Sequence, residues 1–276
     1  RRSGRAGSSI LRNACTVMKV LMIGDIMGEP GRRSVARLLP KLIANHSIDV
    51  VVGNGENVAG GFGITPDLVD DLFDLGVSVI TTGNHAWDKK EILDVFPREP
   101  RLLRPANYPA GVPGRGSYVF TTPGGESLGV LHLMGRAFMP TIDCPFQVAK
   151  REIERLKTQV SAIVVDMHAE ATSEKMAMGH YLDGLVTVVA GTHTHVQTAD
   201  EQILPKGTAY ITDIGMTGPL HSVIGIKKEL AIEKFLTGMP RRFEVASGPV
   251  VFCAVLMELD ATLGKALSIE RIRVVD

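Results

Sequence analysis

Short apolar runs alternate with segments of helical periodicity along most of this chain. Runs typical of buried strands cover residues 19–25, 49–57, 77–85, 161–168 and 185–195. After the first run, apolar residues recur at the spacing of one helical face: Val35, Leu38, Leu39, Leu42 and Ile43. Pro40 lies within this segment and is expected to kink the helix. Further helices are predicted over residues 66–75 and 146–160. Such alternation is typical of α/β proteins.

The C-terminal part of the chain has a different pattern. Residues 209–213, 248–260 and 266–276 are strand-like and are separated by turn signals, which predicts antiparallel hairpins. No linker or internal repeat divides the sequence. We therefore predict one domain over residues 18–276, in which two sheets lie between helices.

Composition limits the functional class. The chain has 276 residues, with 30 basic and 30 acidic side chains, so no basic surplus indicates a nucleic-acid or membrane binder. No apolar run is long enough to span a bilayer. Its three cysteines, Cys15, Cys144 and Cys253, form no CxxC pair, which fits a cytoplasmic protein and excludes a cysteine-built zinc site. Residues 1–17 are Arg-rich and lack acids, and we predict a disordered extension or an artefact of the start site.

Each buried-type run ends in side chains that can bind a metal ion. These residues are Asp25, Glu56, Asn57, Asn84, His168, His193 and His195. Any one of them alone is more often a turn former or a helix cap. In open α/β sheets, however, ligands bind outside the carboxyl ends of the strands, so all seven would meet in one crevice. Their joint occurrence predicts a metal site.

The types of donor narrow the choice of metal. Nitrogen and oxygen donors without thiolate suit Fe, Mn, Zn or Co, and the imidazoles argue against Mg or Ca alone. Seven donors exceed the four of a tetrahedral zinc site, so two ions sharing a carboxylate are expected, with Glu56 as the best candidate for the bridge. A pair of ions suits in-line attack of a bridging hydroxide on phosphorus. Phosphate-ester hydrolysis is the predicted reaction.

Six motifs carry a resemblance to a known family. They are GDIMG, GNGENVAGG, GNHAWD, DMHAEATSEK, GTHTHVQTAD and ITDIGMTGP. Together they resemble the YmdB-like branch of the calcineurin-like metallophosphoesterases, over residues 18–276. The resemblance implies a four-layer α/β/β/α fold, a binuclear iron or manganese site (zinc being an alternative), and 2′,3′-cyclic-nucleotide phosphodiesterase activity. It also implies a homo-oligomer, a dimer or a tetramer.

The resemblance also implies a role for each motif residue. One metal would be held by Asp25, Glu56, Asn57 and His195. The other would be held by Glu56, Asn84, His168 and His193. His85, in GNH, would be the general acid that protonates the departing ribose oxygen. Two positions differ from the broader superfamily: Met27 stands where a histidine is usual, and the Glu56–Asn57 pair replaces a bridging aspartate.

Two alternatives to a phosphodiesterase stay open. The first is a phosphomonoesterase of the same fold, and the second is a metal-binding regulator that acts through partners. His85 favours an enzyme, because a structural metal site needs no adjacent proton donor. No P-loop or G-x-S-x-G motif points to another chemistry. We expect a small phosphoester or nucleotide as substrate, whereas no substrate-binding residue stands out, and the role of His221 stays open.

Overall fold

The computed structural model describes residues 16–276, so the prediction for residues 1–17 concerns mainly residues outside the described part. The helices are α1 (Gly28–His46), α2 (Pro66–Asp74), the 3-10 helix η1 (Lys90–Asp94), α3 (Pro145–Leu156), α4 (Thr172–Leu182) and α5 (Lys228–Thr237). The strands are β1 (Val17–Ile23), β2 (Asp25–Ile26), β3 (Val50–Asn54), β4 (Val79–Thr81), β5 (Leu102–Leu103), β6 (Ser117–Thr121), β7 (Ser127–Met134), β8 (Ala162–His168), β9 (Val188–Thr192), β10 (Gln202–Ile203), β11 (Ala209–Ile211), β12 (Met216–Pro219), β13 (Val250–Asp260) and β14 (Lys265–Val275).

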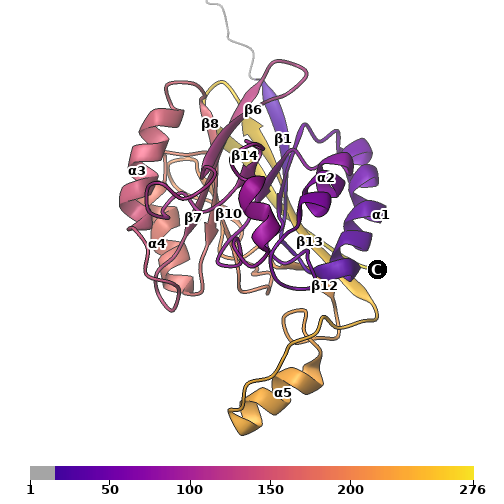
Figure 1. Ribbon diagram of the computed structural model, residues 1–276. Helices are drawn as coiled ribbons and strands as arrows, with labels where there is room; N and C mark the ends of the chain where they lie inside the picture. Colours follow the sequence, from indigo (N-terminus) through magenta and orange to yellow (C-terminus); the bar gives the residue numbers. More distant parts are fainter. Residues whose placement is uncertain (1–15) are drawn as a thin grey trace, which may run out of the picture.

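Two mixed sheets form the centre of the molecule. The first has the strand order β2-β12-β13-β1-β3-β4-β5, with β14 paired to β13, and the second has the order β10-β11-β9-β8-β7-β6. Helices α1 and α2 lie against the outer side of the first sheet, and α3 and α4 against the outer side of the second (Figure 1). The predicted single-domain α/β/β/α sandwich is therefore confirmed.

The strands are apolar on both faces because both faces are covered. In β1, Val20 and Met22 belong to the core between the two sheets. Leu21 and Ile23, on the opposite face, pack in the core beneath α1 and α2. Successive side chains of a strand point to opposite faces, so a strand between two layers needs apolar residues at every position. This is why the sequence shows continuous apolar runs rather than alternation.

Some element predictions need correction. The helix predicted over residues 146–160 ends at Leu156, whose carbonyl accepts hydrogen bonds from the amides of Gln159 and Val160 in a closing turn. Strand β11 was expected in an antiparallel hairpin and does pair so with β10, but it runs parallel to β9. The antiparallel pairing of β13 with β14 is confirmed. Helix α1 continues through Pro40, which is exposed.

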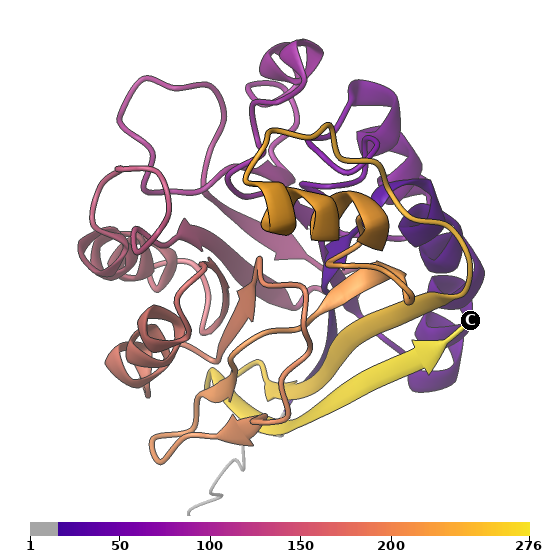
Figure 2. The same cartoon turned by 90° about the horizontal axis from the view of Figure 1, so that it is seen from below.

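Residues 220–249, between β12 and β13, form a segment outside the four layers, which we call the cap. Its helix α5 stands beyond one end of the sheets (Figure 1) and lies in front of them when they are viewed along the strands (Figure 2). Met27, Met216 and Ile226 form a small apolar cluster with Phe243 and Val245 that attaches the cap to the body. Across residues 16–276, no helix combines the length and apolar character that crossing a membrane requires.

Candidate metal centre

The seven predicted donors come from the carboxyl ends of strands in both sheets. In the first sheet, Asp25 lies two residues after the end of β1, where β2 begins, Glu56 and Asn57 follow β3, and Asn84 follows β4. In the second sheet, His168 is the last residue of β8, and His193 and His195 follow β9. The site thus lies where the ends of the two sheets meet. Its formation requires the complete sandwich.

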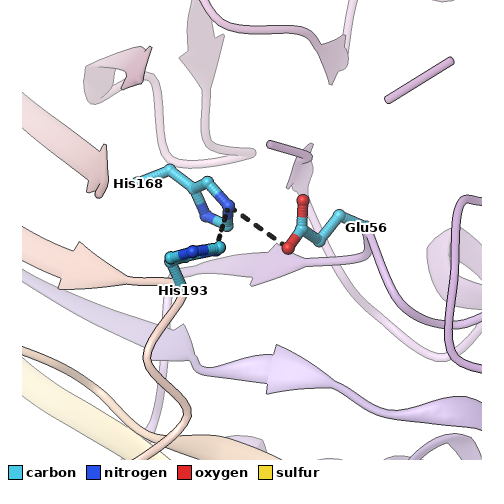
Figure 3. Close-up of side chains that lie close together, drawn as sticks. All are labelled: Glu56, His168 and His193. Atoms are coloured by element: carbon cyan, nitrogen blue, oxygen red, sulfur yellow. Dashed lines mark hydrogen bonds and ion pairs between the residues drawn. The ribbon is translucent and has the colours of Figure 1, made fainter. Parts of the chain in front are cut away.

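Two groups of donor atoms lie close enough to hold metal ions. One comprises Glu56, His168 and His193 (Figure 3), and the other comprises Asp25, Glu56 and His195. Within each group the ligand atoms lie within 4.8 Å of one another. Glu56 is the member that the two groups share.

The two amides complete the set. Nδ2 of Asn57 lies 3.2 Å from both Oε1 of Glu56 and Nε2 of His195. Oδ1 of Asn84 lies 3.0 Å from Nε2 of His168. The structure therefore brings all seven predicted donors together.

The residues present fit a metal ion. Oδ1 of Asp25 is buried and accepts no hydrogen bond from the described residues; Nε2 of His195 lies 3.7 Å away. A Cβ atom on Gly83 would lie 2.2 Å from Oε2 of Glu56 and 2.3 Å from Nε2 of His168, so the glycine keeps the space between the donors open. Carboxylate, imidazole and amide donors of this kind suit Fe, Mn or Zn.

Burial and charge shift the titration of these groups. Burial opposes ionisation of Glu56, but His168 outweighs it and holds the pKa of that carboxyl below its usual range. Burial likewise opposes a charge on His168, yet Glu56 raises its pKa to about 9. Burial raises the pKa of Asp25 to about 6, and burial together with His168 lowers the pKa of His193 to about 3. A positive charge at His168 thus accompanies the Glu56 carboxylate.

A hydrogen-bonded chain behind His168 fixes which of its nitrogens faces the site. The hydroxyl of Thr192 donates to Oδ1 of Asp166 at 2.7 Å and lies 2.9 Å from Nδ1 of His168. Because its single proton goes to the carboxylate, the hydroxyl must accept from the Nδ1–H of His168. Binding of a metal ion would displace the proton on Nε2 of His168, while the proton on Nδ1 stays with Thr192, so that Nε2 is the nitrogen available to the ion.

The other two imidazoles have comparable partners. Nε2 of His193 lies 3.0 Å from Oε2 of Glu170, and its Nδ1 lies 3.1 Å from Nε2 of His168, among the donors. Nδ1 of His195 lies 2.9 Å from the carbonyl oxygen of Ile224, to which it donates, and this leaves Nε2 towards Asp25. Each histidine thus has one nitrogen held and one directed at the site.

The backbone that carries two of these histidines is strained. His193 and His195 adopt φ values of 97° and 65°, in the region that favours glycine. Non-glycine residues in such conformations cost of order 1–3 kcal/mol each and cluster at functional sites. These backbone conformations place both side chains of the His-x-His motif at the end of β9.

His85 lies beside the donors without belonging to either group. Its amide donates to Oε2 of Glu56 at 3.2 Å, and its Nδ1 lies 2.9 Å from Oδ2 of Asp88. If Nδ1–H donates to that carboxylate, Nε2 is the nitrogen left for a reacting group. Phe62 packs edge-on against the ring, with centroids 5.0 Å apart. Asp88 lies within the GNHAWD motif, three residues after His85. This spacing is the signal from which Asp88 could have been predicted as the partner of His85.

A cavity of about 250 Å³ adjoins the donors. Glu56, Asn57, His85, His193 and His195 form part of its lining, and apolar residues of the cap form much of the rest. His132 is fully buried behind His168, whereas His221 is exposed and does not line this cavity. The sequence gives little signal for the cap, because the large apolar residues of α5 are exposed and mark no core face.

The four-layer sandwich, with a carboxylate, amide and imidazole donor set at its strand ends, defines an enzyme of the metallophosphoesterase class. The chain belongs to the YmdB-like protein family, whose model matches residues 21–272. A relative from Bacillus subtilis named 2′,3′-cyclic-nucleotide 2′-phosphodiesterase is 47% identical over 94% of this chain and 98% of its own length.

Solved structures agree with this assignment. A hypothetical protein from Thermus thermophilus has a TM-score of 0.88 at 43% identity, over 94% of this chain and 100% of that chain. A structure described as a novel phosphatase from Mycoplasma pneumoniae also has a TM-score of 0.88, at 37% identity, over 95% of this chain and 94% of that one. The predicted family is confirmed.

Proposed function

We propose that this protein is a binuclear-metal phosphodiesterase. The observation that carries the proposal is that Glu56 is common to the two donor groups. Asp25, Glu56, Asn57 and His195 would hold one ion, and Glu56, Asn84, His168 and His193 the other. The nitrogen and oxygen donors favour iron or manganese, with zinc as the alternative. Bound there, the ions supply an activated water and neutralise charge on the phosphate.

The protein's own groups have four tasks in this proposal. The carboxylates of Asp25 and Glu56 balance the charge of the metal ions. The hydrogen-bonded histidines direct their second ring nitrogens at the metal positions. Asp25, Glu56 and His168 are fully buried, which limits the access of bulk water to these three donors. His85, oriented by Asp88, donates a proton from Nε2 to the oxygen that leaves phosphorus.

We propose 2′,3′-cyclic nucleotides as the substrates. The name of the Bacillus subtilis relative supports this choice, since the two chains match over almost their full lengths. Hydrolysis breaks one of the two ring P–O bonds, adds the oxygen of water to phosphorus and leaves a ribose hydroxyl. A phosphomonoesterase of the same fold is the alternative, favoured by the description of the Mycoplasma pneumoniae structure as a phosphatase.

Replacement of His85 tests the proposed general acid. A ribose alkoxide needs a proton as it leaves, whereas nitrophenolate is stable without one. We expect His85→Ala to lower turnover of 2′,3′-cAMP by ~10²–10⁴-fold. Turnover of bis-p-nitrophenyl phosphate should fall much less, at unchanged metal content. Equal losses on both substrates would remove this role from His85.

We further propose a cytoplasmic homo-oligomer that acts on small molecules and binds neither nucleic acid nor membrane. The two cysteines in the described part of the chain, Cys144 and Cys253, are both free, which supports a reducing compartment. The family resemblance supports a dimer or tetramer. Multi-angle light scattering of the purified protein should give two or four times the monomer mass, and a monomer would contradict the proposal.

A further inference from the structure

The cavity beside the donors has two chemically different sides. One side consists of the donors and His85, which are polar. The other includes Met27, Phe62, Ile224, Phe235 and Phe243. A ligand whose phosphate lies at the donors therefore has an apolar space next to it. Because one cavity includes both sides, a single small molecule can contact both.

The apolar side contains aromatic rings from two separate segments. Phe62 comes from the loop after β3 and packs against His85 at 5.0 Å. Phe235 and Phe243 come from the cap. Phe243 is held by the cluster around Met27, and Nζ of Lys234 lies 4.8 Å from the centre of its ring. Rings at this position suit a planar aromatic group, which stacks on them.

Phe235 is the least covered of these rings. Its side chain is 85% exposed although it lines the cavity, and Ala231 is the one buried residue of α5. Covering a water-exposed phenyl ring with a flat apolar surface lowers the free energy, because apolar area is removed from water. A ligand in the cavity would supply that surface.

We propose that this cavity binds the nucleobase of a cyclic nucleotide, with Phe235 as the stacking residue. The inference rests on the proposed function, because the phosphate must lie at the donors. Apart from Lys234, the cap side chains that line the cavity have no hydrogen-bonding group that could distinguish one base from another. Stacking is tolerant of base identity. The kcat/KM values for the 2′,3′-cyclic phosphates of adenosine, guanosine, cytidine and uridine should therefore lie within about tenfold of one another.

A pair of substrates isolates the contribution of the base. 2′,3′-cAMP and methyl riboside 2,3-cyclic phosphate carry the same reacting ring, and the second has no base. Stacking is worth about 1–3 kcal/mol per base, or roughly 5- to 150-fold, so the kcat/KM of wild type for 2′,3′-cAMP should exceed that for the base-free substrate by a factor in this range. Phe235→Ala should lower this preference about tenfold, whereas Phe235→Trp should keep it.

Leu236→Ala is the matched control. Leu236 is the next residue of α5 and is 81% exposed, but it does not line the cavity. Its replacement should leave the preference for 2′,3′-cAMP unchanged. A preference that survives in Phe235→Ala, or that falls equally in Leu236→Ala, would overturn the assignment of Phe235.

A binding measurement separates this inference from the proposed function. Calorimetry with adenosine 3′-monophosphate and with methyl riboside 3-phosphate needs no turnover. Wild type should bind the adenosine compound about tenfold more tightly, and Phe235→Ala should remove the difference. If wild type hydrolyses neither cyclic substrate yet shows this difference, the proposed activity fails and the base site stands. Equal binding of both compounds by wild type would overturn the base site.

Discussion

At the scale of single residues, the site is organised by the atoms behind the donors as much as by the donors. Nδ1 of His168 lies 2.9 Å from the Thr192 hydroxyl, and Nε2 of His193 lies 3.0 Å from Glu170. Nδ1 of His195 donates to the Ile224 carbonyl. Such partners fix the tautomer of a ligating histidine, and their loss typically lowers metal affinity 10–100-fold.

Replacing Thr192 with valine tests this arrangement. Valine keeps the shape of threonine but removes the hydroxyl, which leaves buried Nδ1 of His168 and Oδ1 of Asp166 without their shared partner. We expect Mn²⁺ affinity to fall by about 10–100-fold, measured by titration against a chelator. Thr192→Ser should restore it. Unchanged affinity in the valine variant would contradict the positioning role.

Replacing Glu56 with glutamine tests the proposed bridge. A neutral amide holds two cations poorly, so occupancy of both metal positions should fall together in elemental analysis of the purified protein. Glu152→Gln is a suitable control, because Glu152 pairs with Arg155 on α3, outside both donor groups. Two tightly bound ions in Glu56→Gln would remove Glu56 from the bridging position.

The donors could be predicted from the sequence, whereas most of their partners could not. Each donor ends a buried run, and that pattern is visible in the sequence. Thr192 was not singled out because its role depends on register: β8 and β9 are parallel, and His168 lies opposite Thr192 in the pairing. That pairing joins residues 24 positions apart, and no local motif specifies it.

At the scale of elements, helices α1, α2 and α3, which cover the sheets, were predicted from the sequence, whereas the cap helix α5 was not singled out. Helical spacing of apolar residues indicates a face that packs on a core. In α1, for example, Val35 and Leu39 lie on that face and are fully buried. In α5 the large apolar residues Ile232, Phe235 and Leu236 are exposed. Its apolar residues therefore do not mark a core face. Their position beside a cavity became visible only once the fold brought the cap to the donors.

Pro40 gives a prediction about α1. It lies in the helix interior and is exposed, and it has no N–H to donate to the carbonyl of Ala36 one turn earlier. Pro40→Ala should raise the free energy of unfolding, by up to about 3 kcal/mol. Thermal unfolding followed by circular dichroism should show a higher Tm. A lower Tm would mean that the proline stabilises this helix.

At the scale of the whole molecule, the sandwich brings chain segments far apart in sequence to one place. Asp25 and Glu56 come from the first sheet, and His168, His193 and His195 from the second, so neither sheet alone contains a complete donor group. The core between the sheets, which includes Val20 and Val164, fixes the distance between them. Folding and formation of the metal centre are therefore expected to be coupled.

The hydrolysis of 2′,3′-cAMP, followed by phosphorus NMR, tests the central claim most directly. Metal-free protein should leave the cyclic diester intact, and addition of Mn²⁺ or reduced iron should convert it to an adenosine monophosphate that persists. In ¹⁸O-labelled water that product should carry one labelled oxygen on phosphorus. A cyclic diester that stays intact with manganese, iron and zinc, or preferential hydrolysis of nucleoside monophosphates, would contradict a phosphodiesterase.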